Sequence, residues 1–482
     1  MFRDSLTTGP GGCGSGSPGI AFDRAVDRHA PELLAAVQEL VRIRSVSGEP
    51  SPGAPFGTGP AEALRAALAI ANRLGFPTVN LDNIVGYAES GAGDDYVAVL
   101  GHLDTVPEGE HWTYPPFGGE IHDKKIYGRG ALDDKGPALA ALFALKAVIE
   151  SGVPLSKRVR VIFGTAEETG GTDIPSYTSR ERPPVSGFTP DANFPVVFAE
   201  KGLLWIELEK PLNTVDSSGA ALVSLSGGTA PNMVPEAAAA VIRTDDPGAI
   251  LRASEEFPRS PGCSLDAAIE GDRVVIRSGG VSAHASTPEK GRNAIMQLLA
   301  FLATQEFGPS GAAGAIRFFA RTIGTETNGA SFGLALSDEP SGGLTLNAGT
   351  IDVTGTTFRI TLDIRHPVTV EKDTVLDRIE ASLRDTGFSA TIRKYDAPLF
   401  YPTDSELIQI LTAVYREATG DETPPVAIGG GTYARKLQNT VAFGPYRPGT
   451  NPPIHRRDEY VGCDELIAMA KIYARAIYAL AK

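Results

Sequence analysis

The clearest pattern along the chain is a short apolar run that ends in polar residues. Residues 97–100 are all apolar, which predicts a buried strand of a parallel sheet. The run stops at Gly101, and His102 and Asp104 follow with one residue between them. Residues two apart on an extended chain face the same side, so the imidazole and the carboxylate can touch. A carboxylate behind a histidine improves it as a metal ligand.

The sequence pattern predicts apolar strands and amphipathic helices in the first part of the chain and again near its end. Periodicity predicts helices at 22–45, 61–74, 138–150 and 464–480. It predicts strands at 81–87, 97–100, 158–163 and 195–199. A strand, a polar turn, a helix and a further strand in succession are typical of an α/β fold with a mostly parallel sheet.

After Lys201 the pattern changes to that of an α+β domain. Strands are expected at 221–225, 273–277 and 357–365, the last with a period of two that indicates one solvent-exposed face. Helices are expected at 293–304 and 370–384. We therefore predict an inserted domain at 202–397, and a first domain made of 22–201 and 398–482. Residues 1–21, rich in Gly, Ser and Pro, are expected to form a disordered tail.

Composition and net charge limit which binding partners and which cellular location are expected. A chain of 482 residues should hold at least two domains. Its net charge of −14 argues against nucleic acid and against an anionic membrane surface as partners. No apolar stretch reaches the ~18 residues of a membrane span. Cys13, Cys263 and Cys463 are far apart and give no disulfide framework, so a cytoplasmic location is expected.

Seven polar residues gather where the predicted strands end, which is where open α/β sheets place their sites. They are His102, Asp104, Asp133, Glu167, Glu168, Asp191 and, much later, His455. Imidazole with carboxylate suits zinc, manganese or cobalt better than magnesium or calcium. Two histidines and three carboxylates exceed one tetrahedral zinc, but they suit two metals that share a carboxylate.

The adjacent pair Glu167–Glu168 is open to two interpretations. One carboxylate can bind metal while the other acts as a general base on water. Taken alone, such a pair is more often a solvated turn. The choice depends on the segments that accompany it.

Those segments resemble the metal-dependent M20 peptidase family. The resemblance is carried by residues 101–107 (Gly-His-Leu-Asp-Thr-Val-Pro), by residues 130–136 (Gly-Ala-Leu-Asp-Asp-Lys-Gly) and by the glutamate pair. Residues 190–192 and 430–435 (Gly-Gly-Thr-Tyr-Ala-Arg) resemble its dipeptidase V branch. The matches run in order from about residue 33 to the C-terminus. They imply a dinuclear-zinc aminopeptidase-like catalytic domain and an inserted α+β lid domain.

The resemblance also implies roles for the ligands. His102 and Asp191 would hold one divalent metal, Glu168 and His455 would hold the other, and Asp133 would bridge them. Two ions per chain are expected, zinc first, with manganese or cobalt as alternatives. Family members carry a cis peptide after the bridging aspartate, which would fall at Asp133–Asp134.

Two further roles near the metals follow from the same resemblance. Asp104 would orient His102, and Glu167 would be the base that activates a metal-bridging hydroxide. The position before the glutamate pair is Ala166, where the dipeptidase branch often has Asp.

A second set of residues in the insert resembles the family's substrate site. His284, in Ser-Ala-His-Ala-Ser, would stabilise the oxyanion, and Asn232 and Arg365 would bind substrate. Arg365 suits a carboxylate, although an exposed sheet arginine is the ordinary alternative. Gly430 and Gly431 could present N–H groups to an anion, or form a plain turn.

The function implied is hydrolysis of dipeptides that carry a free carboxylate, by a monomer in which His284 acts in cis. An N-acyl-amino-acid deacylase would need the same metals and the same carboxylate clamp. A non-catalytic relative that only binds peptides is the alternative from another class, but it would normally have lost a ligand or the base. His29, His111, His122 and His366 are not expected to bind metal.

Overall fold

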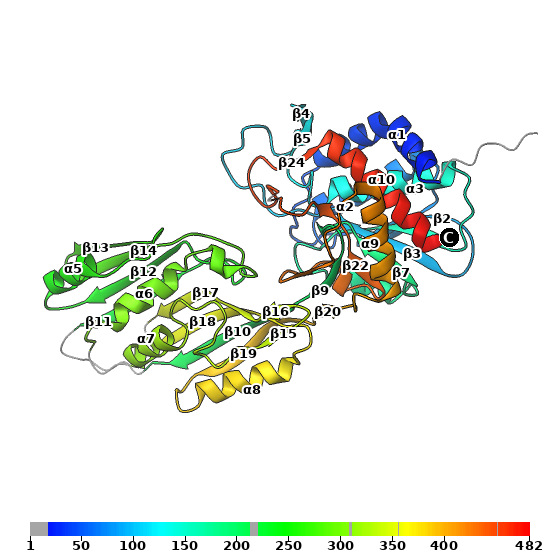
Figure 1. Cartoon of the computed structure of the whole chain (residues 1–482). Coiled ribbons are helices and arrows are strands. Elements are labelled where there is room, and N and C mark those ends of the chain that lie inside the picture. Colours follow the sequence, from blue (N-terminus) through cyan, green and yellow to red (C-terminus); the bar gives the residue numbers. More distant parts are fainter. Residues whose placement is uncertain (1–17, 213–219, 308–310, 355, 451) are drawn as a thin grey trace, which may run out of the picture. The chain divides into compact units, whose positions relative to one another are not determined.

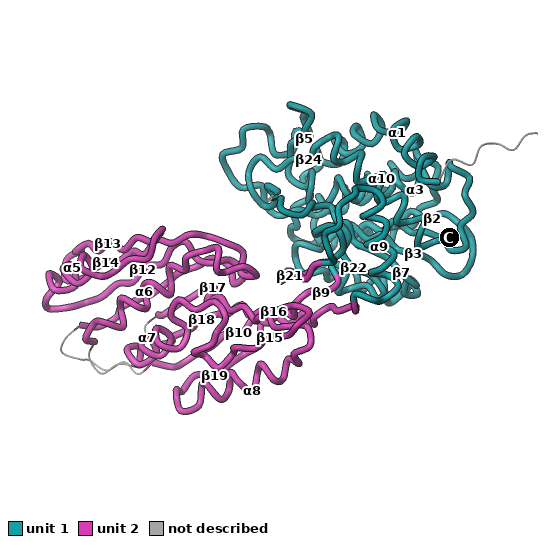
Figure 2. Tube along the Cα trace, viewed as in Figure 1, with its two compact units in different colours: residues 1–197, 403–425, 432–482 teal, residues 198–402, 426–431 magenta. Residues whose placement is uncertain are grey.

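The computed structural model describes residues 18–212, 220–307, 311–354, 356–450 and 452–482 (Figure 1). These form two compact units, coloured separately in Figure 2. Unit 1 contains the described residues up to Val197, together with Thr403–Pro425 and Thr432–Lys482. Unit 2 contains Phe198–Pro402 and Val426–Gly431. Most of the expected tail, with Cys13, lies outside the described residues.

Unit 1 is an α/β unit. Its helices are α1 (Pro18–Val41), α2 (Thr58–Arg73), α3 (Lys135–Glu150), α4 (Ile174–Thr178), η2 (Tyr433–Arg435), α9 (Glu406–Thr419) and α10 (Cys463–Ala481). Its strands are β1 (Thr78–Leu81), β2 (Val85–Ser90), β3 (Tyr96–His102), β4 (Glu120–His122), β5 (Lys125–Tyr127), β6 (Arg158–Gly164), β7 (Ser186–Thr189), β8 (Ala192–Asn193), β22 (Thr440–Ala442), β23 (Pro445–Tyr446) and β24 (Tyr460–Gly462).

The main sheet of unit 1 confirms the expected fold class. Its strands follow the order β1-β2-β6-β3-β7-β22. The central strands β6, β3, β7 and β22 run parallel, whereas β1 and β2 are antiparallel to their neighbours. All seven residues of β3 are buried, as its apolar run predicts. The parallel strands therefore bring their carboxyl ends to one edge.

Helices cover this sheet in a way that its residues explain. A Cβ on Gly101 would meet Ala138 of α3, and a Cβ on Gly86 would meet Leu68 of α2, so both helices pack closely on the sheet. The residues of β2 and β3 that alternate with these two glycines pack with Tyr177 and Tyr433 in a separate apolar cluster. Helices α1 and α10 pack on α3. Within the described ranges, no helix combines the length and the apolarity that a membrane span requires.

Unit 2 is an antiparallel sheet with helices. The helices are α5 (Pro247–Glu256), η1 (Pro288–Lys290), α6 (Ala294–Ala303), α7 (Gly311–Thr322) and α8 (Lys372–Leu383). The strands are β9 (Val197–Glu200), β10 (Gly202–Pro211), β11 (Ala221–Gly227), β12 (Ala237–Arg243), β13 (Ser264–Glu270), β14 (Arg273–Gly279), β15 (Ser337–Asp338), β16 (Gly342–Gly343), β17 (Thr345–Thr354), β18 (Thr357–His366), β19 (Ser389–Asp396), β20 (Leu399–Phe400) and β21 (Val426–Ile428).

The large sheet of unit 2 has the order β13-β14-β12-β11-β17-β18-β10-β19, with antiparallel neighbours throughout. Helix α6 packs on β12, β14 and β17 and against α7. The isoleucines at 360 and 364 lie in the apolar core, as their alternation predicts. The other face of β18 differs from the expectation of a wet face, because Asp363 and Arg365 are both buried.

Several expected boundaries are corrected. Residues 18–21, expected to belong to the tail, lie in α1, because Pro18 begins this helix at a position where proline is well tolerated. The strand expected at 81–87 is a hairpin, because Asp82 and Asn83 take positive φ angles between β1 and β2. Residues 426–431 belong to unit 2 instead of the first domain, because β21 pairs with β9.

Candidate metal centre and catalytic residues

The expected metal ligands come from separate elements of unit 1 and meet at the carboxyl edge of its sheet. His102 is the last residue of β3, Asp133 precedes α3, Glu168 follows β6, Asp191 lies between β7 and β8, and His455 precedes β24. Parallel strands place their carboxyl ends side by side, which explains how residues 353 positions apart in the sequence come together.

Two groups of possible ligand atoms share one carboxylate. His102, Asp133 and Asp191 form one group, and Asp133, Glu168 and His455 form the other, each with ligand atoms within 4.8 Å of one another. The two oxygens of Asp133 divide between them. Oδ1 lies 3.0 Å from His102 Nε2, and Oδ2 lies 3.0 Å from His455 Nε2. Asp133 therefore has the placement that a bridging ligand needs.

The outer carboxylates complete these groups. Glu168 Oε1 lies 3.0 Å from His455 Nε2, and Asp191 Oδ2 lies 3.7 Å from His102 Nε2. His102 is fully buried, whereas about half of the His455 side chain is exposed. His455 also has a φ of 56°, which is uncommon for a residue other than glycine. The expected cis peptide is present at Asp133–Asp134.

Asp104 contacts both His102 and the glutamate turn. Its carboxylate Oδ1 lies 3.6 Å from His102 Nδ1, which is long for a hydrogen bond, while its backbone oxygen lies 3.0 Å from that nitrogen. The carboxylate instead accepts the backbone N–H groups of Glu167, at 3.0 Å, and Glu168, at 3.1 Å. The backbone of Asp104 orients the imidazole, and its side chain holds the turn of the glutamate pair.

A second buried carboxylate holds the same turn from its other side. Asp173 Oδ2 accepts the N–H groups of Thr165, at 2.7 Å, and Ala166, at 3.2 Å. The hydroxyl of Tyr433 donates to the same oxygen at 2.5 Å. Sequence reasoning missed Asp173, because none of the segments that resemble the family contains it. The available sequence signal for this contact was Tyr433, because it lies in the 430–435 segment that resembles the dipeptidase V branch.

Glu459 and Arg129 are a further pair that the sequence did not reveal. Glu459 is fully buried, and its Oε1 accepts the N–H groups of Leu132, at 3.1 Å, and Asp133, at 3.3 Å. Its Oε2 accepts from Arg129 Nη1 at 2.7 Å. The pair thus fixes the backbone that presents the bridging Asp133. Nothing in the spacing distinguishes Glu459 from its neighbour Asp458.

The electrostatics of the cluster favour added positive charge. Burial, helped by the carboxylates of Glu168, Asp104 and Asp133, raises the pKa of Glu167 to about 8 against the opposing effect of His102. Burial likewise raises the pKa of Asp191 well above its ordinary value. Burial lowers the pKa of His455, but its hydrogen bonds to Asp133 and Glu168 outweigh this and raise it to about 11. Glu167, Asp191 and His455 thus shift toward the protonated form, which is the response to a local excess of negative charge. Asp133 is the exception, because its hydrogen bonds to the two histidines outweigh burial and lower its pKa.

The donor set fits a pair of divalent cations. Each group offers one imidazole nitrogen and carboxylate oxygens, a combination that zinc, manganese and cobalt accept. A bound cation would offset the negative charge of the crowded carboxylates, which the two histidines alone offset only in part. Glu167 belongs to neither group, so it remains available for a proton-transfer role.

The remaining predicted residues belong to unit 2. His284 and Asn232 lie on adjacent segments joined by a β-bridge between Met233 and His284. The Nδ1 atom of His284 lies 2.7 Å from Ser286 Oγ. Gly430 and Gly431 follow β21 and lie at least partly exposed. The structure therefore brings His284 and Asn232 together within this unit.

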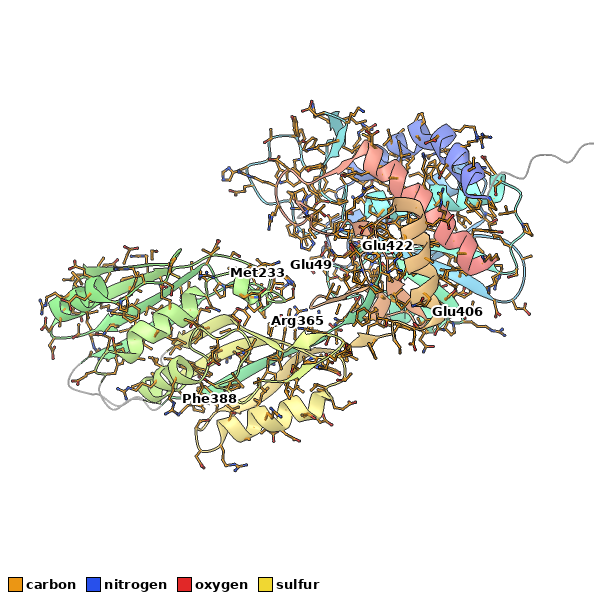
Figure 3. The ribbon with its side chains drawn as sticks, in the orientation of Figure 1. Glu49, Met233, Arg365, Phe388, Glu406 and Glu422 are labelled. Atoms are coloured by element: carbon orange, nitrogen blue, oxygen red, sulfur yellow. The ribbon has the colours of Figure 1, made fainter. Side chains whose placement is uncertain are left out.

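Arg365, labelled in Figure 3, is held more firmly than an exposed sheet arginine. Its Nε and Nη2 donate to the two carboxylate oxygens of Asp363 at 2.7 and 2.9 Å, and Nη1 donates to Gly429 O at 3.2 Å. Asp363 also accepts from Trp205 Nε1 at 2.8 Å. A guanidinium has five N–H donors. Two of them, one on each terminal nitrogen, thus have no partner among the described residues.

Comparison with known proteins identifies the family of the chain. The model of peptidase family M20/M25/M40 matches residues 98–479. A Bacillus subtilis (strain 168) protein named "Putative dipeptidase YtjP" is 40% identical over 461 residues, which cover 95% of this chain and 99% of the relative. A similarly named protein of Staphylococcus saprophyticus is 34% identical over 456 residues, covering 93% of this chain and 97% of the relative.

A solved structure shares the fold at low sequence identity. Human carnosine dipeptidase 1 matches with a TM-score of 0.58 and 16% identity, over 96% of this chain and 99% of that one. At that identity the likeness concerns the fold.

Proposed function

Because the chain belongs to peptidase family M20/M25/M40, we propose that it is a metal-dependent dipeptidase. The observation that carries this proposal is the pair of ligand groups that share Asp133, with Glu167 beside them and outside both. The names of the relatives, which describe dipeptidases, support the choice of substrate class.

We assign the metals as follows. His102 and Asp191 would hold one divalent ion, Glu168 and His455 the other, and Asp133 would bridge them, with zinc as the expected ion. When bound, the ions would supply Lewis acidity and make an attacking water more acidic. Metal analysis of protein purified without chelators should give two ions per chain. A ratio fixed at one across zinc and manganese additions would rule out the dinuclear assignment.

Glu167 would move the protons. Its carboxylate would accept a proton from the attacking water and later donate it to the leaving amine, as a general base and then a general acid. Glu167 lies outside both ligand groups, and Asp104 keeps it in place through the backbone of the glutamate turn. His284 would stabilise the oxygen of the scissile carbonyl as negative charge develops on it.

Arg365 would bind the terminal carboxylate of the substrate. Two N–H groups remain beyond its contacts with Asp363 and Gly429, and Asp363 prevents the guanidinium from turning. Asn232, Gly430 and Gly431 would supply further donors. A carboxylate bound in this way favours short substrates, because a longer peptide lacks a carboxylate at that distance from the scissile bond.

The test is a hydrolysis panel with zinc, manganese or cobalt added. Dipeptides should be cleaved, and Glu167→Gln protein prepared in parallel should be inactive on every substrate. Cleavage of N-acyl amino acids in preference to dipeptides would replace this proposal with a deacylase. Hydrolysis of neither class, with metals bound, would favour a peptide-binding relative.

We also propose that the chain acts as a monomer, with His284 serving the site of its own chain. Mixing inactive His284→Ala protein with inactive Glu167→Gln protein tests this. No activity should return. Recovery of activity in the mixture would show that His284 acts on a partner's site.

A further inference from the structure

Asn232 is flanked by two carbonyls that one buried side chain holds. Asn347, on β17, donates from Nδ2 to Pro231 O at 3.2 Å and to Met233 O at 2.8 Å. Only 3% of Asn347 is exposed. A buried amide amid the apolar residues of β17 is costly unless its hydrogen bonds are made, and these two bonds go to the residues on either side of Asn232.

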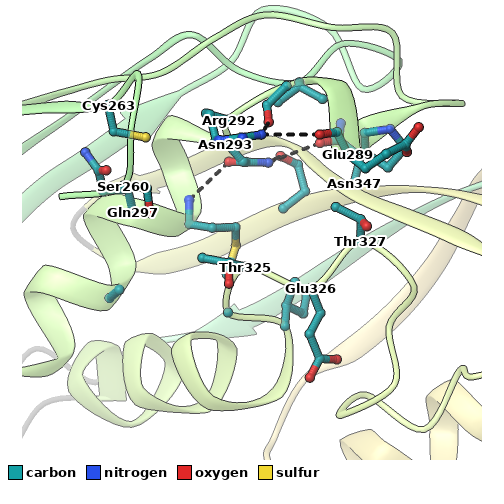
Figure 4. A pocket seen from close by; sticks show the side chains of 18 of the residues that line it. Ser260, Cys263, Glu289, Arg292, Asn293, Gln297, Thr325, Glu326, Thr327 and Asn347 are labelled. Carbon is teal, nitrogen blue, oxygen red and sulfur yellow. Dashed lines mark hydrogen bonds between the residues drawn. The ribbon is translucent and has the colours of Figure 1, made fainter. Parts of the chain in front are cut away.

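A second asparagine fixes the orientation of the first. Asn293 donates from Nδ2 to Asn347 Oδ1 at 3.1 Å and to Ala348 O at 2.9 Å (Figure 4). Its own Oδ1 accepts from Met296 N at 3.1 Å and so caps α6. With its oxygen bound to Asn293, the Asn347 amide can only direct its NH₂ group toward the 231–233 segment.

The held segment is joined in turn to the one that carries His284. Val234 N donates to Ala283 O at 2.8 Å, and Ala285 N donates to Asn232 O at 2.9 Å. These bonds lie on both sides of His284. Any shift of the 231–233 backbone would therefore be transmitted to the imidazole.

Gly349 gives independent support for a close and specific contact. A Cβ at this position would lie 2.3 Å from Pro231 O and 2.5 Å from Pro231 Cα, which is closer than atoms can approach. The pairing of β17 with β18 also shifts register between Ala348 and Thr350. The strand is thus locally irregular where the Pro231 backbone packs against it.

We infer that Asn347 is a positioning residue that sets the geometry of Asn232 and His284, with Asn293 fixing its amide. The inference rests on the proposed function, in which those two residues contact the substrate. A displacement of about 1 Å in catalytic geometry can cost on the order of 100-fold in rate. The expected consequence of losing Asn347 is therefore a lower kcat with the metals retained in unit 1.

The first experiment compares Asn347→Ala with Gln297→Ala. Gln297 is a matched control, a buried amide on α6 of the same unit whose Nε2 donates to Ser264 O and Ser278 Oγ, away from Asn232 and His284. Asn347→Ala should lower kcat for dipeptides by at least about tenfold. Gln297→Ala should lower the melting temperature without a comparable loss of kcat. Equal kcat values for both variants, or loss of kcat in both, would overturn the inference.

A variant that retains all side-chain donors gives a second measurement if Asn347→Ala does not fold. Gly349→Ala must displace Pro231 and should lower kcat in the same way. A kcat for Gly349→Ala equal to that of the unmutated chain would overturn the inference.

Hydrogen–deuterium exchange separates this inference from the proposed function. In Asn347→Ala the amides of Val234 and Ala285 should exchange faster than in Gln297→Ala. Unchanged exchange would overturn the inference even if the wild type cleaves dipeptides. Failure of the wild type to cleave dipeptides would instead refute the proposed function, and faster exchange would still show that Asn347 holds the segment.

Discussion

The two units satisfy their buried charges in opposite ways. In unit 1, the carboxylates around Asp133 outnumber the two histidines that contact them, and burial raises the pKa values of several of these acids. In unit 2, the buried Asp363 meets one guanidinium in two hydrogen bonds and an indole N–H in a third. The first arrangement is incomplete without added cations. In the second arrangement the carboxylate of Asp363 already has its hydrogen-bond donors, and only N–H groups of Arg365 remain for a ligand.

This difference indicates what each unit is built to bind. An excess of buried carboxylate attracts divalent cations, whereas an arginine fixed by a carboxylate presents its remaining donors to an anion. The proposed dipeptide substrate would use both. The comparison also makes clear predictions, because a change in the carboxylate cluster of unit 1 should affect metals and chemistry, whereas a change at the Arg365–Asp363 pair of unit 2 should affect substrate preference.

The largest effect is expected at the glutamate pair. Glu167→Gln should lower kcat by roughly 10²–10⁴-fold with both metals retained, since a general base contributes about that much. Glu168→Gln should lower the metal content as well, because Glu168 belongs to a ligand group. Metal analysis beside kinetics distinguishes the two. If Glu167→Gln lost metal and Glu168→Gln kept it, the roles would be reversed.

Next in size is the pair that supports Asp133. Arg129→Ala would leave the fully buried Glu459 without its cation, and breaking such a pair costs about 3–5 kcal/mol of unfolding free energy. Denaturant unfolding measures the loss. The exposed pair Lys124–Asp464 provides a control, and Lys124→Ala should cost at most about 1 kcal/mol. Equal losses from the two variants would contradict the assigned role of Arg129.

A smaller effect is expected on the substrate side. Losing a charge-assisted hydrogen bond costs about 1.5–3 kcal/mol, so amidating the C-terminus of a dipeptide should lower kcat/KM by roughly tenfold or more. In Arg365→Ala the free and the amidated dipeptide should be cleaved at similar rates, with the metals unchanged. The ratio of the two rates is the useful measurement. Any instability caused by leaving Asp363 without its guanidinium partner affects both rates equally. Equal cleavage by the unmutated enzyme would contradict the carboxylate contact.

The smallest effect concerns an acid remote from either site. Partial burial raises the pKa of Glu150, but hydrogen bonds from His29, Arg28 and Lys146 outweigh this and lower it from 4.5 to about 2. A lowered pKa in the folded state means that Glu150 stabilises the fold above pH 4.5, and that this contribution is lost as the pH falls toward 2. After a discount for solvent, we expect about 1 kcal/mol.

The measurement is the difference in unfolding free energy between wild type and Glu150→Gln at pH 7 and at pH 3. The difference should be larger at pH 7. A difference that does not change with pH would mean that the ionised carboxylate contributes nothing to stability.

The local elements were largely readable from the sequence because their signals are local. The apolar run at 97–100 predicts β3, and the alternation at 357–365 predicts β18, with the isoleucines at 360 and 364 in the core. Errors occurred where short-range chemistry opposed the apolar pattern. Asp82 and Asn83 divide a predicted strand, because their positive φ angles make a hairpin turn.

The sequence by itself determined most candidate ligands and the candidate base, because His102, Asp133, the glutamate pair and Asp191 lie in segments that resemble the family's motifs. Only the tertiary structure decided how they are supported. Asp104 binds the glutamate turn through its carboxylate and His102 through its backbone, and Glu459 holds the backbone of Asp133. The physical reason is that a motif specifies which groups are present along the chain. Which buried donor meets which buried acceptor depends on contacts between segments that lie hundreds of residues apart, and no local pattern encodes those contacts.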